Sequence, residues 1–311
     1  MRPLKYVCGG ILVLACAGAL NQWAAGALDR RANPAPGRMV EAGGLRMHLN
    51  CTGQGPATVV LDSGLSDSSL AWFKVQPRVA EFARVCSYDR AGIGWSDVSP
   101  RPRTSRVIAE ELHALLRAGA IAPPYVLVGH SMGGLDVRAY AGMYKDEVAG
   151  MVLVDSSHPD QFNRLPGGSS SGNAWRRGLE RQRLLMPFGI PRLLGWCGTA
   201  APEIRAAFRS FDCTIRQKDT TLAEVDAFPE SARQAAATAT LGALPLVVLS
   251  HDPDKWPEGV KVWPELQEEL KRLSSRGTRV VAKGSGHQIA LERPDVVVTA
   301  VRSVIDAIGR R

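Results

Sequence analysis

The stretch LVGHSMGGL (residues 127–135) places one serine between glycines, directly after an apolar run. The apolar residues before this serine predict a buried strand, and those after it recur at helical spacing. Ser131 is therefore expected at a sharp strand-to-helix turn, where Gly129 and Gly133 keep Cβ atoms away from a backbone that doubles back. A G-x-S-x-G match alone is a weak signal, but strand, turn and helix in this order favour an exposed, reactive serine.

Apolar strands and helices alternate along most of the 311 residues. This pattern predicts an α/β fold with a doubly wound, mostly parallel sheet, opened by a hairpin at Gly43 and Gly44. An apolar content of 45% is ordinary for a globular protein of this size. The predicted strands are 38–44, 45–53, 57–64, 84–90, 124–128, 150–155, 244–250 and 278–287, and the predicted helices are 69–83, 104–120, 135–150, 263–275 and 294–309.

The alternation stops between residues 159 and 244. GGSSSGN (residues 167–173) predicts a flexible loop, and the sequence after it is helix-like and rich in arginine. A segment of this length is too long for a connecting loop, so we expect a helical subdomain here. The flanking segments 38–158 and 245–311 then form the α/β core.

Residues 1–28 differ in composition from the rest of the chain. Two basic residues precede an uncharged apolar segment at 6–20, as in a signal peptide, with small-residue cleavage points at 17–19 or 25–27. Continued to residue 28, the uncharged segment is long enough to cross a bilayer as one helix, and Cys16 loosely fits a lipoprotein cleavage site. A cleaved signal peptide, a retained membrane anchor and a lipoprotein leader would each export the rest of the protein to the cell envelope or beyond. A polar linker at 29–37 separates this leader from the body of the protein.

The net charge and the cysteine content are compatible with an exported protein. The net charge is +8, but the 38 basic residues are scattered and form no nucleic-acid motif, so we expect a basic surface that is favourable near an anionic membrane. Four of the six cysteines lie in the exported body, which suggests two disulfides, with four buried thiols as the alternative. No cysteine or histidine spacing indicates a metal or a cofactor. The four cysteines of the exported body are Cys51, Cys86, Cys197 and Cys213.

Three motifs in this order resemble the α/β-hydrolase fold family, in its serine esterase and lipase-like branch. They are GHSMGG at 129–134, YDRAGIGWSD at 88–97 and GSGHQIALERPDVV at 284–297, and the resemblance covers the chain from about Gly37 to Ile308. It implies an eight-stranded sheet with a helical cap inserted after strand six. It also implies catalysis without a cofactor.

The serine needs a base and an acid. His287 follows the last strand and is the natural base, whereas His48, His113 and His130 are weaker candidates. The acid has two candidate positions. The family's usual position after strand seven falls on Asp254, with Asp252 as a competitor, but His251 stands where a glycine is expected. A minority of the family takes its acid from the end of strand six, where Asp155 lies, and we favour Asp155 with Asp254 as the alternative.

The resemblance also implies the remaining parts of the site. An oxyanion hole needs two N–H donors, and the family positions are the backbone N–H groups of Met132 and Leu65. The family's second and fourth strands are antiparallel neighbours, so the resemblance implies a disulfide between Cys51 and Cys86. Cys197 and Cys213 would then form a second disulfide within the cap.

A serine at the turn indicates acyl transfer, since dehalogenase and epoxide hydrolase relatives use aspartate there. We expect hydrolysis of carboxylic esters, small or lipid-like, through an acyl-enzyme on Ser131. Amides, thioesters, lactones and transfer to an alcohol would use the same residues, and a catalytically idle envelope binding protein is the alternative from another class. The expected partners are an ester substrate and, through residues 6–28, a membrane. We expect no nucleic acid. The substrate, the fate of the leader and the oligomeric state stay open at this point.

Overall fold

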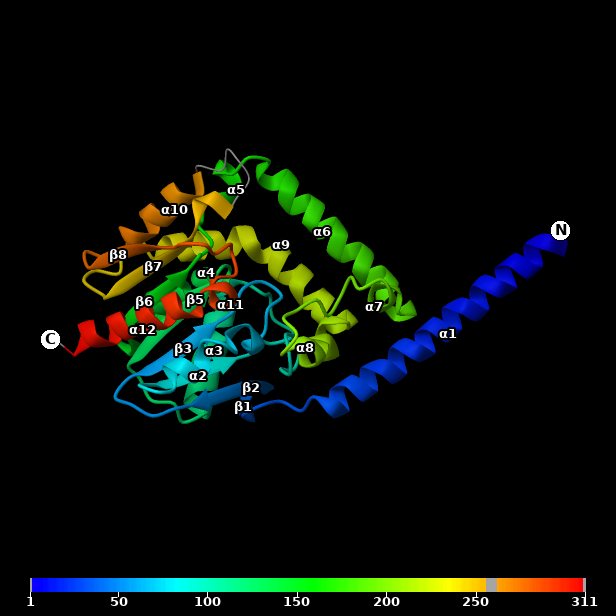
Figure 1. Cartoon of the computed structure of the whole chain (residues 1–311), viewed down its shortest axis with the longest axis horizontal. Coiled ribbons are helices and arrows are strands. Elements are labelled where there is room, and N and C mark those ends of the chain that lie inside the picture. Colours follow the sequence, from blue (N-terminus) through cyan, green and yellow to red (C-terminus); the bar gives the residue numbers. More distant parts are fainter. Residues whose placement is uncertain (1, 256–261, 310–311) are drawn as a thin grey trace.

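The computed structural model of the chain describes residues 2–255 and 262–309, with the backbone alone at residues 2–5 and 169–171. Its centre is an eight-stranded sheet in the order β1-β2-β4-β3-β5-β6-β7-β8 (Figure 1). The first two strands form an antiparallel hairpin, β2 is antiparallel to β4, and β3 to β8 are parallel. The predicted fold class is therefore confirmed. The strands are β1 (Arg38–Ala42), β2 (Leu45–Thr52), β3 (Thr58–Asp62), β4 (Arg84–Tyr88), β5 (Tyr125–His130), β6 (Val148–Val154), β7 (Leu246–His251) and β8 (Gly277–Ala282).

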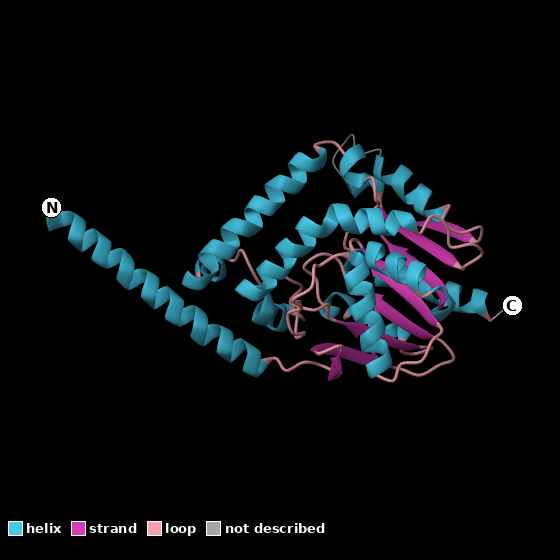
Figure 2. Cartoon of the chain, turned by 180° about the vertical axis from the view of Figure 1, so that it is seen from behind, coloured by secondary structure: helices cyan, strands magenta, loops and turns pink. Residues whose placement is uncertain are grey.

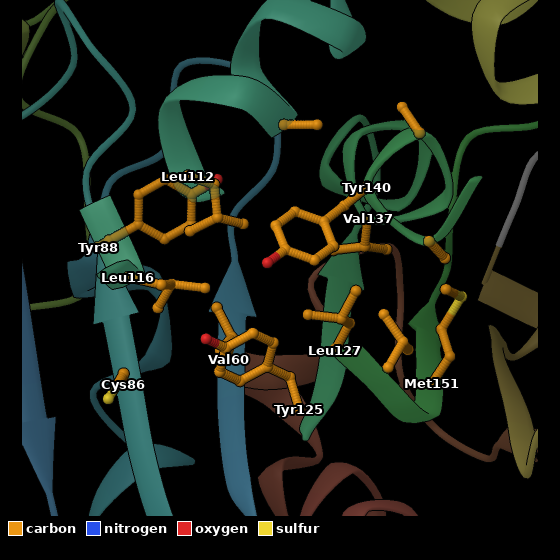
Figure 3. Packing of buried hydrophobic residues seen from close by; sticks show 14 of the residues in the cluster. Val60, Cys86, Tyr88, Leu112, Leu116, Tyr125, Leu127, Val137, Tyr140 and Met151 are labelled. Carbon is orange, nitrogen blue, oxygen red and sulfur yellow. The ribbon is translucent and has the colours of Figure 1, made fainter. Parts of the chain in front are cut away.

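Helices cover both faces of the sheet, so its central strands are buried on both sides. In β3, Val60 faces one core cluster, whereas Val59 and Leu61 face the other. Figure 3 shows part of the first cluster, where residues of four strands meet side chains of α3 (Ser105–Ala118) and α4 (Gly133–Met143). The helix α10 (Val262–Lys271) covers the same face, and α12 (Pro294–Ile308) covers the opposite one. Burial on both faces explains why these strands are continuous apolar runs in the sequence.

The prediction of one continuous helix over residues 69–83 is wrong. The structure has a 3₁₀ turn, η1 (Ser69–Trp72), followed by the single-turn helix α2 (Gln76–Val79). Pro77 explains the break, because proline lacks an N–H donor and its ring clashes with the preceding turn. It lies in the first turn of α2, where a proline is tolerated.

The described elements between β6 and β7 are all helical, and Figure 2 shows them beside the sheet rather than within it. Residues 167–173, predicted as a flexible loop, instead begin α6. Gly172 lies against the ring of Phe162, so packing on α5 overrides the low helix propensity of glycine and serine. The elements are α5 (Gln161–Arg164), α6 (Gly168–Leu185), η3 (Met186–Phe188), α7 (Ile190–Leu193), α8 (Arg205–Asp212) and α9 (Ile215–Ala237).

The first helix, α1 (Arg2–Ala32), projects from the rest of the molecule at its N-terminal end (Figure 1). Its segment Tyr6–Ala32 is long and apolar enough to cross a membrane, although a signal sequence has the same properties. The helix runs four residues into the predicted linker at 29–37. Arg30 and Arg31 lie in its last turn, where basic side chains stabilise the negative end of the helix dipole.

Both expected disulfides are present. Cys51 and Cys86 are register partners in the antiparallel pair β2–β4, and their sulfurs are 2.06 Å apart. Cys197 joins Cys213, at the end of α8, across 16 residues of the helical insertion. Two disulfides together with an apolar N-terminal helix fit an exported protein.

Candidate active site

Ser131 lies between the end of β5 and the start of α4, at a backbone φ of 51°. A positive φ is unfavourable for a residue with a side chain, and such residues gather where the surroundings enforce the conformation. The neighbouring glycines are required by space. A Cβ on Gly129 would lie 2.5 Å from the carbonyl oxygen of Gly133, and a Cβ on Gly133 would lie 2.6 Å from that of Ser63. The turn therefore brings the serine hydroxyl to the carboxyl edge of the sheet.

His287 reaches this hydroxyl from the loop between β8 and α11 (Ile289–Glu292). The distance from Ser131 Oγ to His287 Nε2 is 3.1 Å, which suits a hydrogen bond donated by the hydroxyl. The other ring nitrogen, Nδ1, is 2.6 Å from Asp155 Oδ2. A carboxylate can only accept, so Nδ1 carries the proton and Nε2 is free to accept one.

The structure brings Asp155, and not Asp254, to the imidazole. Asp155 follows β6 at a φ of 42° and is fully buried. Asp254 lies exposed in the turn η4 (Pro253–Lys255). The competitor Asp252 is occupied elsewhere, since its Oδ2 accepts the backbone N–H of Gly284 at 2.8 Å.

Three further donors hold the carboxylate of Asp155. Its Oδ1 accepts the backbone N–H of His251 at 3.0 Å, the Nδ1–H of the same imidazole at 2.9 Å and the indole N–H of Trp263 at 2.9 Å. Burial alone would raise the pKa of Asp155, but the hydrogen bonds from His251 and His287 outweigh it and hold that pKa well below its ordinary value. The group is therefore a carboxylate at neutral pH. His251 stands where the family pattern has a glycine, and sequence reasoning did not predict its contact with the acid.

The pKa values of two histidines of the site are shifted in opposite directions. Burial opposes the imidazolium of His287, but the hydrogen bond and the negative charge of Asp155 prevail, so its pKa is raised above the ordinary value. Burial lowers the pKa of His130 to about 3, so its ring is neutral. Its Nε2 is 3.0 Å from the carbonyl oxygen of His287, to which it donates, and this bond fixes the loop that carries the base. His48 and His113 lie away from Ser131, each beside a carboxylate, Asp89 and Glu147 respectively.

The two expected oxyanion donors lie on separate elements. Met132 precedes α4, so its N–H has no partner within that helix. Leu65 lies in the loop after β3, and the carbonyl oxygen of Gly64 accepts a hydrogen bond from Arg90 at 2.8 Å. In a trans peptide the N–H points opposite to the C=O. The N–H of Leu65 therefore points away from Arg90.

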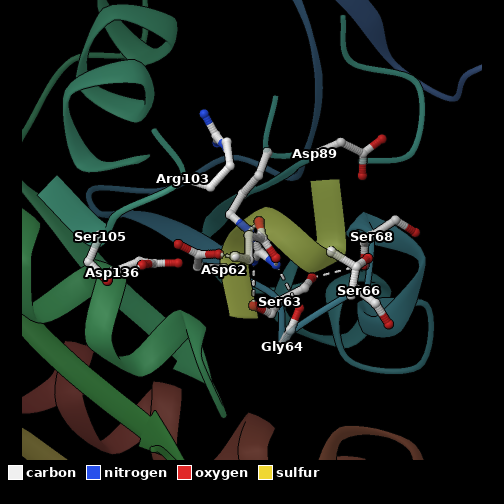
Figure 4. A network of polar contacts seen from close by, with 12 residues as sticks. Asp62, Ser63, Gly64, Ser66, Ser68, Asp89, Arg103, Ser105 and Asp136 are labelled. Carbon is white, nitrogen blue, oxygen red and sulfur yellow. Dashed lines mark hydrogen bonds and ion pairs between the residues drawn. The ribbon is translucent and has the colours of Figure 1, made fainter. Parts of the chain in front are cut away.

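Arg90, from the YDRAGIGWSD motif, is buried beneath this loop. Its guanidinium donates to the carbonyl oxygen of Ser63 at 2.6 Å and pairs with Asp62 at 3.0 Å, two residues labelled in Figure 4. On its other side it pairs with Glu224 of α9 at 2.8 Å. Burial raises the pKa of Asp62 to about 6, with Arg90 and Tyr88 opposing the rise. This network, which sequence reasoning missed, ties the loop of Leu65 to the helical insertion.

A cavity of about 600 Å³ is lined by Leu65 and by residues of the helical insertion. Its volume lies in the range of small-molecule sites. A larger cavity, of about 990 Å³, lies between α4 and the connection from α9 to β7. Neither Ser131 nor His287 lines either cavity, and Leu65 is the residue that links the smaller one to the expected oxyanion donors. The apolar lining of the smaller cavity comes from Leu65, Phe162, Trp175, Val225, Phe228, Pro229, Ala232 and Ala236.

Comparison with known proteins agrees with this architecture. The chain is 27% identical over 256 residues to the uncharacterized protein YqjL of Bacillus subtilis, which covers 81% of this chain and 85% of that protein. It is 27% identical over 222 residues to the uncharacterized protein C23C11.06c of Schizosaccharomyces pombe, which covers 70% of this chain and 40% of the yeast protein. The chain thus spans less than half the length of that second relative.

Two solved structures share the fold at identities too low to indicate an activity. A thermophilic esterase from Thermogutta terrifontis superposes with a TM-score of 0.66 at 23% identity, covering 87% of this chain and 98% of the esterase. Cfl2 from Burkholderia cenocepacia has a TM-score of 0.68 at 24% identity, covering 86% and 94%. A family model described as the alpha/beta hydrolase fold matches residues 57–235, more than half of the chain. The chain therefore belongs to the alpha/beta hydrolase fold family.

Proposed function

We propose that this chain is a serine hydrolase that cleaves carboxylic esters through an acyl-enzyme on Ser131. One observation carries the proposal: a continuous hydrogen-bonded chain runs from Ser131 Oγ through the imidazole of His287 to Asp155. A serine hydroxyl is a poor nucleophile at neutral pH unless a base takes its proton. Membership of the family supports hydrolase activity, and the serine at the turn favours acyl transfer.

In the proposed mechanism, Ser131 Oγ attacks the ester carbonyl carbon while its proton moves to His287 Nε2. The imidazolium that forms is stabilised by Asp155, which also fixes the proton of the neutral ring on Nδ1. The carbonyl oxygen becomes negative and accepts hydrogen bonds from the N–H groups of Met132 and Leu65. His287 then protonates the leaving alcohol. A water molecule, deprotonated by His287, attacks the acyl-enzyme and releases the acid and Ser131.

The cavity beside Leu65 supports esters with an apolar acyl or alcohol group. Its walls include Phe162, Trp175 and Phe228, and they also include Leu65, the residue proposed to bind the oxyanion. A cavity of about 600 Å³ holds a medium-length chain better than an acetyl group alone. The proposed substrates are therefore esters with an extended apolar group, lipid-like esters included.

The location of the enzyme and its domain division are part of the proposal. We place the body of the protein outside the cytoplasm, with residues 1–28 as its leader or anchor and 159–244 as a cap over the site. The two disulfides and the apolar α1 support export, because disulfides persist in oxidising compartments.

A series of p-nitrophenyl esters of increasing acyl length tests the proposal on the full-length chain in detergent. We expect hydrolysis that improves from acetyl towards medium-length chains and that disappears in Ser131→Ala. Asp254→Asn is the matched control, since Asp254 is exposed and should not affect the reaction. Absence of hydrolysis across the whole series, in a folded protein, would contradict the esterase proposal.

A further inference from the structure

The helical insertion carries a group of exposed large apolar side chains next to α1. Five such residues fall within residues 184–196, and we call them the apolar lobe patch. Large apolar residues exposed singly are ordinary, but a contiguous group indicates a contact surface. Their exposed fractions are 69% for Leu184, 42% for Phe188, 84% for Leu193, 52% for Leu194 and 38% for Trp196.

The part of the helical insertion that carries this patch, from the end of α6 through α8 (residues 184–213), is docked on the C-terminal half of α1, and we call it the lobe. Gly18 lies against the backbone of Phe188, so closely that a Cβ there would overlap its carbonyl oxygen. Gln22 Nε2 donates to the carbonyl oxygen of Cys213 at 2.6 Å. Further along, Asp29 pairs with Arg192 at 2.6 Å. Figures 1 and 2 both show α1 passing beside α7 and the end of α6.

The free part of α1 is too short to cross a bilayer by itself. Residues 6–14 are all exposed, and Gly18 lies against the backbone of Phe188. The segment 6–17 rises only about 18 Å at ~1.5 Å per residue, whereas the hydrocarbon core is about 30 Å thick. A helix that crosses the membrane must therefore take its docked part, and the lobe with it, into the outer half of the bilayer. A helix that enters only part way leaves the lobe at the membrane surface.

The lobe also pairs the amide of Gln22, a polar group of α1 that would otherwise face lipid. Gln22 interrupts the apolar face, and an unpaired amide in an apolar medium is costly. Both ends of this amide are paired with the lobe, since Oε1 accepts from Arg192 Nε at 3.1 Å and Nε2 donates to Cys213. These bonds suit a helix and a lobe that enter an apolar environment together.

The charge around the patch matches an anionic lipid surface. Residues 174–211 contain seven arginines and two acidic residues, Glu180 and Glu203. Four of these arginines pair with carboxylates outside this segment, so the charge left for anionic lipid comes from Arg177, Arg181 and Arg205. The guanidinium of Arg181 lies 4.9 Å from the ring centroid of Trp196. Arginine beside tryptophan and leucine is typical of segments that lie at the headgroup boundary, where basic residues are attracted to anionic lipid.

We propose that the apolar lobe patch docks on the lipid bilayer beside α1, with its apolar side chains at the boundary of headgroups and acyl chains. The helical insertion, and not only α1, then contacts the membrane. This surface is separate from the catalytic residues, and the inference does not depend on the esterase activity.

The test places an environment-sensitive fluorophore at Leu193→Cys in the full-length chain. The two cysteines outside the disulfides are first replaced, as Cys8→Ala and Cys16→Ala. The protein is reconstituted in phosphatidylcholine vesicles containing phosphatidylglycerol. Quenching by nitroxide-labelled lipids and by aqueous iodide is then measured. The matched control is Ser303→Cys, an exposed position on α12 at the opposite end of the molecule.

The proposal expects the probe at 193 to be quenched several-fold more strongly by nitroxide lipids than the probe at 303, and to be shielded from iodide. The control position should show the reverse. Iodide quenching at 193 equal to that at 303 would overturn the proposal. Shielding from iodide without quenching by nitroxide lipids would also overturn it, because a second protein surface would then cover the patch.

Discussion

Replacing Asp155 with asparagine should nearly abolish turnover while leaving the protein folded. The side chain keeps its size but exchanges one carboxylate oxygen for an NH₂ group. The oxygen that remains at the position of Oδ1 can still accept from the two donors of His251 and from Trp263, although the contact of His251 Nδ1 with Oδ2, at 2.9 Å, is lost. The NH₂ group then faces His287 Nδ1, whose proton must leave because two donors cannot pair. The proton moves to Nε2, which can no longer accept the proton of Ser131.

The size of this effect follows from the lost tautomer and the lost charge. The equivalent change in a serine triad lowers kcat by about 10⁴-fold, which corresponds to about 5 kcal/mol at ~1.4 kcal/mol per tenfold. The assay is steady-state hydrolysis of the best p-nitrophenyl ester, with KM expected to change little. Asp254→Asn is the control and should keep nearly full activity. If Asp155→Asn retained a tenth or more of the wild-type kcat, the assignment of the acid would be wrong.

Three further predictions follow from the geometry. His251→Phe removes a side-chain hydrogen bond to the carboxylate of Asp155, and such a bond is worth about 1.5–3 kcal/mol. We expect a lower melting temperature and a kcat reduced by about tenfold. If both values were unchanged, His251 would not position Asp155. The kcat/KM should fall as the pH drops through the pKa of His287, which is raised above its ordinary value of about 6.5, because the protonated ring cannot accept a proton. In Asp155→Asn this acidic limb of the pH profile should move to lower pH. An unshifted limb would refute the claim that Asp155 raises the pKa of His287. Cys51→Ala with Cys86→Ala should lower the free energy of unfolding by about 3 kcal/mol, measured by denaturant titration. An unchanged free energy of unfolding would contradict a stabilising bond between these two cysteines.

The sequence predicted the nucleophile turn from local constraints alone. Ser131, Gly129 and Gly133 are adjacent in the chain, and their conformation depends on a short strand and helix that are both readable. The acid was harder to assign, because Asp155 and Asp254 both follow predicted strands. Only the three-dimensional paths of the two loops decide which carboxylate faces His287.

Other features could not be predicted because they depend on contacts between distant segments. The pairing of Arg90 with Glu224 joins residues 134 positions apart. The start of α6 in a glycine- and serine-rich segment depends on packing against Phe162. A histidine in place of the expected glycine at 251 marked a position where a side chain, rather than a bare turn, meets the acid.

The most direct test of the central claim is the site of covalent modification by a fluorophosphonate. The full-length chain is treated with the reagent, and its intact mass and peptide masses are measured. We predict one adduct, on Ser131, formed in Asp254→Asn as in the wild type and absent in Ser131→Ala and His287→Ala. No adduct on the folded wild-type protein, or equal labelling of Ser131→Ala, would contradict the assignment of Ser131 as the nucleophile.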